Sequence, residues 1–216
     1  MKIALITAMQ CEYDAVASLY HFNSEGRAVA YGHDLMLIKS GIGKVNGALA
    51  AMKACLANVD LVINTGLAGG IDSCLSQGDI VLADKTCYHD VWCGSPNEKG
   101  QVQDLPLYYE VPQKVLKAVS SAAPEFKTGL IVTGDVFLTD PIRLKEIKAD
   151  FKSALAVDME SAAVAQTCHI HHKPYLSLRI ISDVVGKETQ LNDYDNFWQN
   201  MPQKASQMVD TVLKNL

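Results

Sequence analysis

The stretch Leu178-Arg179-Ile180-Ile181-Ser182-Asp183 joins an apolar run to an acid. It belongs to a run that predicts a β-strand over residues 174–181, so Asp183 follows shortly after the strand. A second stretch, Val157-Asp158-Met159-Glu160, also sets acidic groups at the edge of an apolar element. A carboxyl beside Val, Ile and Leu is poorly solvated in its charged form, so it can stay protonated near neutral pH and donate a proton. For any one of these acids a helix cap or a strand end is the simpler explanation, and function is argued from their combination.

Apolar, β-branched runs alternate with helical patterns along the whole chain. We expect strands at 2–8, 35–39, 60–65, 79–83, 128–133 and 174–181, and helices at 10–20, 43–58, 112–123, 141–151, 159–171 and 193–214. Pro112 and Pro141 fall at helix starts, where a missing N–H costs nothing. Such alternation is typical of strands covered by helices on both faces. The pattern predicts one α/β domain over residues 1–216, with three α/β/α layers.

The composition is that of an ordinary globular protein. Hydrophobic residues make up 49% and charged residues 20% of the 216 residues, which is enough for one large core. The net charge is −5 and no run of lysine or arginine is present, which argues against nucleic-acid binding. No apolar stretch approaches the roughly 20 residues that cross a bilayer, and the short β-like run after Met1 does not resemble a signal peptide. We therefore expect a cytoplasmic protein that binds neither nucleic acid nor a membrane.

The cysteines and histidines do not form a metal-binding pattern. The six cysteines include no CxxC pair, so neither a zinc site nor a redox dithiol is indicated. His169, His171 and His172 lie beside Cys168, but they fall at the end of a predicted helix, where histidines commonly meet the negative end of the helix dipole. Because further ligands are missing nearby, we expect no metal and no other cofactor.

Three glycine-bearing turns follow predicted strands, at 40–44, 64–70 and 133–135. In an open α/β sheet, ligands bind at the carboxyl ends of the strands, and glycine lets the backbone approach them. For any one of the three, a tight turn that needs positive φ is the simpler explanation. None matches a dinucleotide fingerprint or a P-loop, which argues against NAD and nucleoside triphosphates. The irregular region 85–110 is long, and such loops in compact domains are usually functional or interfacial.

An ordered set of short segments covers nearly the whole chain. It comprises Met1-Lys2-Ile3, Ala8-Met9, Glu12, Ser40-Gly41-Ile42-Gly43-Lys44-Val45-Asn46, Asn64-Thr65-Gly66, Ala68-Gly69-Gly70, Gly78-Asp79-Ile80-Val81, Tyr88-His89-Asp90, Gly134-Asp135, Phe137, Val157-Asp158-Met159-Glu160 and Ser182-Asp183. In this order the segments resemble the purine nucleoside phosphorylase and uridine phosphorylase superfamily, and within it the 5'-methylthioadenosine/S-adenosylhomocysteine nucleosidases. The resemblance implies a central mixed, twisted sheet of the nucleoside phosphorylase type.

The resemblance also implies hydrolysis of the bond between adenine and ribose. Breaking this bond builds positive charge on the sugar and negative charge on the departing base. Asp183 would give a proton to N7 of the purine, and Glu12 would accept one from the attacking water. Glu160 would hold the ribose hydroxyls, Met159 would pack under the sugar, and Arg179 would help to fix the water. For Glu12, a favourable place in a first helical turn is the simpler alternative.

The same resemblance implies which other residues contact the substrate. Phe137 would stack on adenine and the backbone at Leu138 would read its polar edge, although a lone Phe after a strand is more often part of the core. Met9, Ile42 and Tyr194 would line the pocket for the 5' substituent. The resemblance further sets Ala68, Gly69 and Ser182 against the substrate. Pro106 and its neighbours in the loop 90–106 would reach into the partner subunit's site, which implies a homodimer.

Some positions depart from the nucleosidases. Leu67 stands where they usually carry Ser, and a leucine cannot donate a hydrogen bond. Tyr194 stands where they commonly carry Phe, after a one-residue insertion, and its hydroxyl would favour a more polar 5' group. The segment Trp92-Cys93-Gly94 also differs from the better-known bacterial enzymes. These departures leave the preferred substrate open.

The main question that the sequence leaves open is whether water or phosphate accepts the sugar when the bond to the base breaks. Phosphorylases of the superfamily need an anion site, generally built from arginines and a serine, and this chain carries only Arg27, Arg143 and Arg179. We therefore favour water, with adenine and a 5-substituted ribose released from methylthioadenosine or S-adenosylhomocysteine. A phosphate-dependent purine nucleoside phosphorylase, a futalosine-type nucleosidase and a nucleoside-binding protein without turnover are the alternatives.

Overall fold

Strands and helices alternate along the chain. The computed structural model describes residues 1–200 and 202–216. Its strands are β1 (Lys2–Thr7), β2 (Arg27–Ala30), β3 (His33–Lys39), β4 (Leu61–Gly70), β5 (Ile80–Tyr88), β6 (Tyr109–Glu110), β7 (Lys127–Thr133), β8 (Ala154–Asp158) and β9 (Tyr175–Val184). Its helices are α1 (Gln10–Ala17), α2 (Lys44–Leu56), α3 (Gln113–Ala122), α4 (Pro141–Asp150), α5 (Ser161–Ile170), α6 (Gln190–Asn200) and α7 (Pro202–Lys214).

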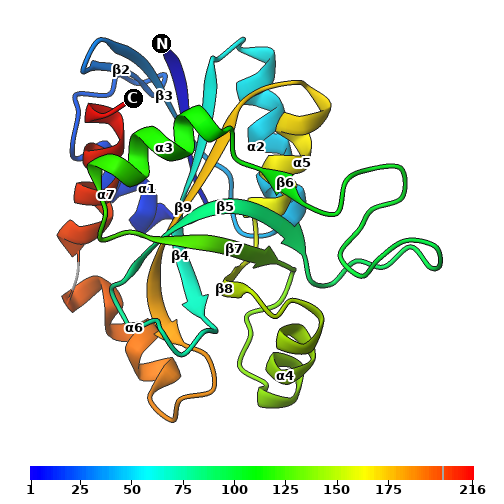
Figure 1. The fold of residues 1–216 in the computed structure, drawn as a ribbon. Helices are drawn as coiled ribbons and strands as arrows, with labels where there is room; N and C mark the ends of the chain where they lie inside the picture. Colours follow the sequence, from blue (N-terminus) through cyan, green and yellow to red (C-terminus); the bar gives the residue numbers. More distant parts are fainter. Residues whose placement is uncertain (201) are drawn as a thin grey trace.

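The strands form one mixed sheet in the order β2-β3-β1-β4-β8-β7-β5-β6. Strand β9 pairs in parallel with β4 and antiparallel with β5, so β4, β8, β7, β5 and β9 close a circuit. Helices α1, α3 and α7 lie on one side of the sheet, and α2 and α5 lie on the other (Figure 1). This arrangement confirms the expected α/β class with a central mixed sheet.

The core is built from strands that are apolar on both faces. Residues Ile3 to Ile6 of β1 have no exposed surface, because β3 and β4 flank β1 in parallel and helices α1 and α2 pack against it. Burying one such large apolar side chain contributes about 1.5–3 kcal/mol. The central strands are therefore rigid supports for the polar residues at their carboxyl ends.

The helices expected up to residue 171 are confirmed, with ends that differ by a few residues. Helix α4 begins at Pro141 as predicted, and the N–H of Ile142 donates to Asp140 Oδ1 at 2.8 Å to cap it. Pro112 lies at the N-cap of α3. In place of one helix over 193–214 there are two, α6 and α7, and α7 begins at Pro202, which cannot continue a helix. Residue 201, inside the expected helix, lies outside the described residues.

Strands β2, β6 and β8 are additions to the predicted sheet. Strand β8 follows α4 closely and pairs with β7 in parallel and with β4 antiparallel. Its residues before Asp158 are small or apolar, and nearly the whole strand is buried, so it lacks the apolar and polar alternation that marks a half-exposed strand. Strand β2 is short and lies at the edge of the sheet, where it pairs with β3.

The glycine-bearing turn expected at 64–70 is instead the second half of β4. This strand continues to Gly70, paired along its length with β9. Neighbouring groups come so close to these glycines that a side chain would not fit: a Cβ on Gly69 would lie 2.9 Å from a methyl of Val185. Here glycine serves close approach within a strand rather than a turn.

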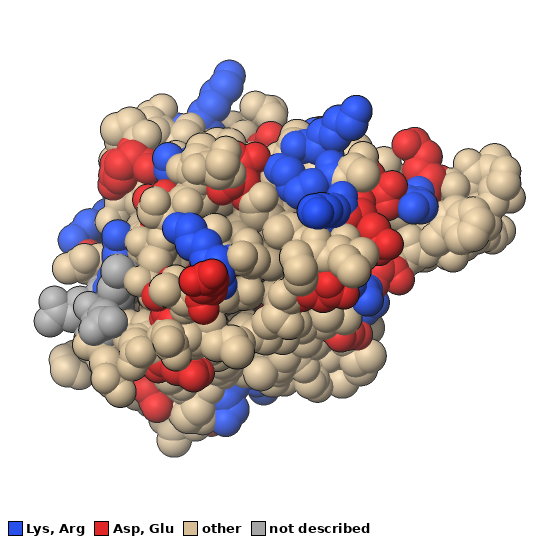
Figure 2. Space-filling model, turned by 90° about the horizontal axis from the view of Figure 1, so that it is seen from below, with Lys and Arg blue, Asp and Glu red and all other residues tan. Residues whose placement is uncertain are grey.

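A long loop separates β5 from β6. Residues 89–108 contain neither helix nor strand, which confirms the irregular character predicted for most of 85–110. The loop projects from the body of the molecule as an arm (Figure 1), and much of its tip is uncharged (Figure 2). Within the described residues, no helix is long and apolar enough to cross a bilayer.

Candidate active site

A cavity opens where several strands end. The walls are mostly apolar, with a few carboxyl and hydroxyl groups among them. They comprise Ala8, Met9, Glu12, Ile42, Leu67, Ala68, Gly69, Val136, Phe137, Leu138, Val157, Asp158, Met159, Glu160, Ser182, Asp183, Val185 and Tyr194.

Segments that are distant in sequence meet at this cavity. Residues 8–12 run from the end of β1 into the first turn of α1, residues 67–69 belong to β4, and residues 157–160 run from the end of β8 to the start of α5. Residues 136–138 follow β7, residues 182–185 run across the end of β9, and Tyr194 comes from α6. The cavity thus lies at the carboxyl ends of strands, where ligands bind in α/β sheets.

Glu12 is buried and held by backbone donors. Its Oε2 accepts from the N–H groups of Ala8 and Met9, and its Oε1 accepts from the N–H of Leu67, all at 2.9 Å. Gly66 leaves the room for this arrangement, because a Cβ there would lie 2.5 Å from Oε1. Burial raises the pKa of Glu12, although the backbone donors oppose the shift.

Arg179 lies behind the cavity rather than on its wall, and only 1% of it is exposed. Its Nε donates to Asp158 Oδ2 at 2.8 Å, and its Nη2 lies 3.8 Å from Glu160 Oε2. The same Nη2 donates to Asn64 Oδ1. A buried guanidinium needs such partners, because an unpaired charge in the interior is costly.

Asp158 serves both the arginine and a helix start. Besides Arg179, it accepts from Thr133 Oγ1 at 2.6 Å and from the backbone N–H of Ser161, the first residue of α5. Asp158 therefore caps the start of α5, as the simpler explanation predicted. Its contact with Arg179 also neutralises the buried guanidinium.

Glu160 lies between the cavity and Arg179. Its Oε1 accepts from the Gly43 N–H at 2.8 Å, and α2 comes close because Gly47 has no side chain: a Cβ there would lie 3.2 Å from Glu160 Cβ. Burial and then the charge of Asp158 raise the pKa of Glu160, against the opposing effect of Arg179.

Asp183 is buried near the end of β9. Ser182 Oγ donates to its Oδ1 at 2.6 Å, and Gln190 Nε2 donates to its Oδ2 at 2.8 Å. Burial raises the pKa of Asp183, the two donors lower it, and the charge of Asp193 raises it further. The three acids Glu12, Glu160 and Asp183 thus share one cavity, each with a raised pKa.

One part of the cavity wall is aromatic and apolar. The rings of Phe137 and Tyr194 lie 4.9 Å apart and are tilted by 59°. The Tyr194 hydroxyl lies 3.7 Å from Met9 Sδ, and Ile42 is half exposed beside them. This part of the wall suits a flat base and an apolar substituent.

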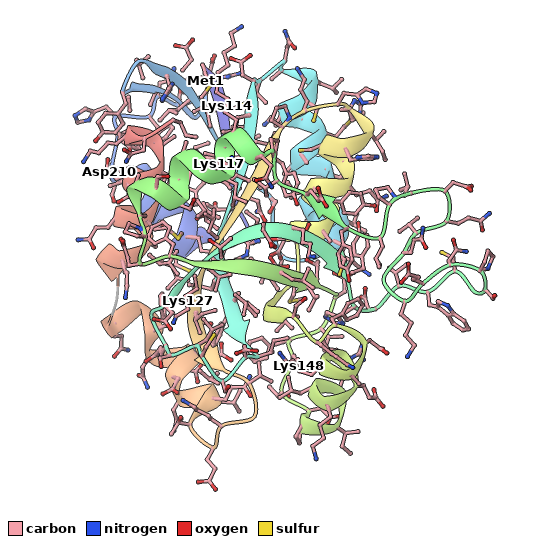
Figure 3. The ribbon with its side chains drawn as sticks, viewed as in Figure 1. Met1, Lys114, Lys117, Lys127, Lys148 and Asp210 are labelled. Atoms are coloured by element: carbon pink, nitrogen blue, oxygen red, sulfur yellow. The ribbon has the colours of Figure 1, made fainter. Side chains whose placement is uncertain are left out.

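The part of the cavity wall that the structure describes carries no cation. Within the described residues, no lysine or arginine lines it. Lys114 and Lys117 lie on α3 and Lys127 on β7, away from it, while Lys148 of α4 reaches Asp72 at 2.9 Å (Figure 3). An anion such as phosphate would therefore meet carboxyl groups without a neutralising side chain on the wall.

Of the residues predicted for the site, all but two line the cavity. The exceptions are Arg179, which lies behind it, and Pro106, which belongs to the projecting loop. The prediction did not include six further wall residues next to predicted ones, namely Ala8, Leu67, Val136, Val157, Asp158 and Val185. It also missed Asn64 and Gln190, which bind Arg179 and Asp183 from outside the cavity. Asn64 could have been found, because the segment Asn64-Thr65-Gly66 belongs to the family resemblance. Gln190 could not, because nothing in the sequence around residue 190 indicates a role in the site.

Comparisons with known proteins agree on the family. The model of the phosphorylase superfamily matches residues 2–214. The 5'-methylthioadenosine/S-adenosylhomocysteine nucleosidase of Bacillus subtilis is 34% identical over 232 residues, covering 100% of both chains. A structure of the Streptococcus pneumoniae MTA/SAH nucleosidase in complex with 8-aminoadenine is 33% identical over 100% of both chains, with a TM-score of 0.93. The native futalosine hydrolase of Helicobacter pylori is 26% identical, with a TM-score of 0.92 over 100% of this chain and 98% of that one. The chain belongs to the phosphorylase superfamily, and within it to the branch of the 5'-methylthioadenosine/S-adenosylhomocysteine nucleosidases.

Proposed function

We propose that this protein hydrolyses the N-glycosidic bond of 5'-modified adenosines, releasing adenine and a 5-substituted ribose. The observation that carries the proposal is the meeting of three buried carboxyls, Glu12, Glu160 and Asp183, in one largely apolar cavity. Departure of a purine needs an acid, and attack by water needs a base. The nucleosidase relatives, similar over the whole chain, support the same reaction.

Asp183 is the proton donor to N7 of the base in this mechanism. Its burial raises its pKa, so the protonated form persists closer to neutral pH than for an exposed carboxyl. Leu138, on the same wall, offers backbone groups to the polar edge of adenine, and Phe137 offers a ring face. Ala68, Gly69 and Ser182 bound the same space.

Glu12 is the base that takes a proton from the attacking water. Its three backbone donors hold the carboxylate in one orientation, so little reorganisation is needed when the water is activated. Arg179 lowers the pKa of Glu12 from behind the wall and so keeps part of its basic form available. The guanidinium acts by its charge, since Arg179 lies outside the cavity.

Glu160 binds the ribose hydroxyls, and Met159 packs under the sugar. A carboxylate accepts two hydroxyl hydrogens, which suits the paired hydroxyls of ribose. The negative charges of Glu160 and Glu12 also favour the positive charge that develops on the sugar. Met9, Ile42 and Tyr194 surround the 5' substituent, and the Tyr194 hydroxyl adds one polar group to that wall.

Water is favoured over phosphate as the acceptor. The described cavity wall has no lysine or arginine, and the charge of Arg179 is already engaged by Asp158 and Glu160. Leu67 lines the cavity with an apolar side chain and contributes only its backbone N–H, which Glu12 occupies. A phosphate dianion would lack a charged partner there.

We further propose a cytoplasmic homodimer in which the loop 90–106, with Pro106, completes the partner's site. The loop projects from the body of the protein, and Trp92 on it is 64% exposed. Helix α2 carries an exposed apolar stripe, Val45, Leu49, Met52 and Leu56, which we call the α2 stripe. Contiguous exposed apolar surface of this kind marks interaction sites. In the cell, such an enzyme recycles by-products of S-adenosylmethionine use.

One assay separates the proposed reaction from its rivals. The protein is incubated with methylthioadenosine, S-adenosylhomocysteine, adenosine and inosine, with and without phosphate, and the free base is followed by chromatography. We expect adenine from the 5'-modified adenosines at rates that phosphate does not change. Release that requires phosphate would establish a phosphorylase, and faster release of hypoxanthine than of adenine would favour a 6-oxopurine substrate of the futalosine type. Binding without release would establish a non-catalytic protein.

A further inference from the structure

Gln190 bridges two groups that the proposed mechanism uses. It is the first residue of α6, is 5% exposed and does not line the cavity. Its Nε2 donates to Asp183 Oδ2 and to the Leu138 carbonyl, each at 2.8 Å, and its Oε1 accepts from the Gly186 N–H at 3.0 Å. Both hydrogens and the oxygen of the amide are therefore engaged.

We propose that Gln190 is a positioning residue that fixes the Asp183 carboxyl against the cavity and directs its proton to Oδ1. The inference rests on the proposed function, in which Asp183 protonates the base and Leu138 reads its edge. One amide nitrogen binds both groups, so it sets the spacing between the acid and the backbone that contacts the base. A buried amide with all its hydrogen bonds made is a rigid support.

The chemistry of the amide decides which oxygen carries the proton. Gln190 Nε2 can only donate, so Asp183 Oδ2 remains an acceptor whether or not the acid is protonated. The proton is thereby favoured on Oδ1, because a protonated oxygen is the poorer acceptor. Ser182 Oγ lies 2.6 Å from Oδ1 and 3.3 Å from the Ala68 carbonyl, so its single hydrogen has two acceptors.

These contacts allow both protonation states of Asp183. When Oδ1 carries the proton, the Ser182 hydroxyl donates to the Ala68 carbonyl; when Asp183 is ionised, it donates to Oδ1. In the reaction the Oδ1–H bond breaks, the proton passes to N7 of the base, and the electron pair stays on Oδ1. The carboxylate that forms then accepts from Ser182 and Gln190 at once, which stabilises its charge.

The other groups around Asp183 oppose ionisation. Strand β8 contributes apolar Val157 to the cavity and α6 contributes Tyr194, whose own pKa is raised by burial and then by nearby acids. Helix α6 also carries Asp193 outside the cavity wall, and its charge raises the pKa of Asp183. Gln190 and Ser182 are the side-chain donors that favour the charged form. Without Gln190, Ser182 would be the remaining side-chain donor to the carboxylate and the pKa of Asp183 would be higher.

The test compares Gln190→Met with the wild-type protein. Methionine keeps the length of the side chain and removes the donor. Because a hydrogen bond to a charged group stabilises that charge, its loss should raise the Asp183 pKa by roughly 1–2 units. The pKa is measured in the protein without substrate by ¹³C NMR titration of the aspartate carboxyl carbons, with the Asp183 signal assigned from its loss in Asp183→Asn. The alkaline limb of kcat for adenine release should move to higher pH by the same amount.

Gln77→Met is the matched control. Gln77 Nε2 also donates to two acceptors, the carbonyls of Ser182 and Asp193 at 2.9 and 2.8 Å, and so ties α6 to β9 without touching the Asp183 carboxyl. This variant also loses two donated hydrogen bonds, one of them to α6, and we expect the Asp183 pKa to stay at its wild-type value. An unchanged pKa in Gln190→Met, or an equal shift in Gln77→Met, would overturn the proposal.

Gln190→Glu gives a second test that does not depend on the fold of the methionine variant. The glutamate keeps the size of the side chain, and its charge beside Asp183 should raise the Asp183 pKa further than Gln190→Met does. A lower pKa would contradict the assignment. If the wild-type protein releases no adenine, the proposed function fails, whereas the NMR titration still decides whether Gln190 controls Asp183.

Discussion

Arg179 is the residue on which the charge balance of the cavity depends. It is the one buried cation close to Asp158 and Glu160 among the described residues, and its charge also lowers the pKa of Glu12. Removing one partner of such a buried pair costs about 3–5 kcal/mol. The guanidinium of Arg179 therefore stabilises the fold and lowers the pKa of Glu12, although it does not line the cavity.

Replacing Glu12 by Gln should remove the proposed base. Loss of a general base lowers the rate by about 10²–10⁴-fold, so we expect kcat for adenine release to fall by that factor. Gln also presents an amide group to the Ala8, Met9 and Leu67 donors, which lowers stability as well. The control is Asp14→Asn, an exposed acid two residues further along α1, which should keep its rate. Equal rates for the two variants would remove Glu12 from the mechanism.

The raised pKa of Glu160 makes stability depend on pH. Between its ordinary value of 4.5 and its raised folded value, the folded protein binds a proton that the unfolded chain does not. The contribution of Glu160 to the free energy of unfolding is therefore present at low pH, and it is lost as the pH rises through the pKa of Glu160 in the folded protein. Glu160→Gln cannot titrate, so the wild-type protein should be more stable relative to this variant at pH 5 than at pH 8. Urea unfolding across this range measures the difference, and parallel stability curves would contradict a raised pKa.

The ordered set of segments predicted most side chains on the cavity wall, and it did not predict the supporting contacts. Glu160 and Asp183 stand in short motifs next to apolar strands, whereas Glu12 was indicated by the family resemblance of the whole set. Gln190 reaches Asp183 only because α6 turns back against β9, and its neighbours in sequence carry no signal. A contact made by chain reversal depends on tertiary structure that local patterns do not encode.

Strand β4 shows how an element's glycines serve the site. Gly66→Ala would put a Cβ 2.5 Å from Glu12 Oε1, so the carboxylate must move away from its backbone donors. We expect kcat to fall by at least about tenfold, since small displacements of catalytic groups are costly. Gly70→Ala on the same strand meets a methyl of Ile181 at 3.1 Å instead, and should lower stability more than kcat. Steady-state kinetics with thermal unfolding of both variants tests the comparison; similar kcat values would contradict it.

Elements with a clear periodic pattern were predicted well, and those without one were missed. Helices α1 to α5 and strands β1, β3, β7 and β9 stand close to their expected positions. Strand β8 was missed because burial on both faces removes the alternation that identifies a strand. The second half of β4 was mistaken for a turn because glycine is common in both settings, and only the close approach of Val185 and Glu12 explains its use here.

At the scale of the whole molecule, the α2 stripe predicts assembly. Leu49→Glu places a charge at its centre, and 65% of Leu49 is exposed in the single chain. We expect this variant to be monomeric by light scattering and to lose activity, because the loop 90–106 could no longer complete the partner's site. Val29→Glu is the control, since Val29 is 73% exposed on β2, the edge strand. A wild-type monomer, or a dimeric Leu49→Glu variant, would contradict the proposed interface.

The site itself is a property of the whole chain, because its proposed base lies on α1 and its proposed acid near the end of β9. The most direct test is the initial rate of adenine release from methylthioadenosine in phosphate-free buffer, for the wild-type protein and for Asp183→Asn. We predict steady release by the wild-type protein and a rate lower by about 10²–10⁴-fold in a variant that folds normally. Near wild-type release by Asp183→Asn, or no release by the wild-type protein until phosphate is added, would contradict a hydrolase whose acid is Asp183.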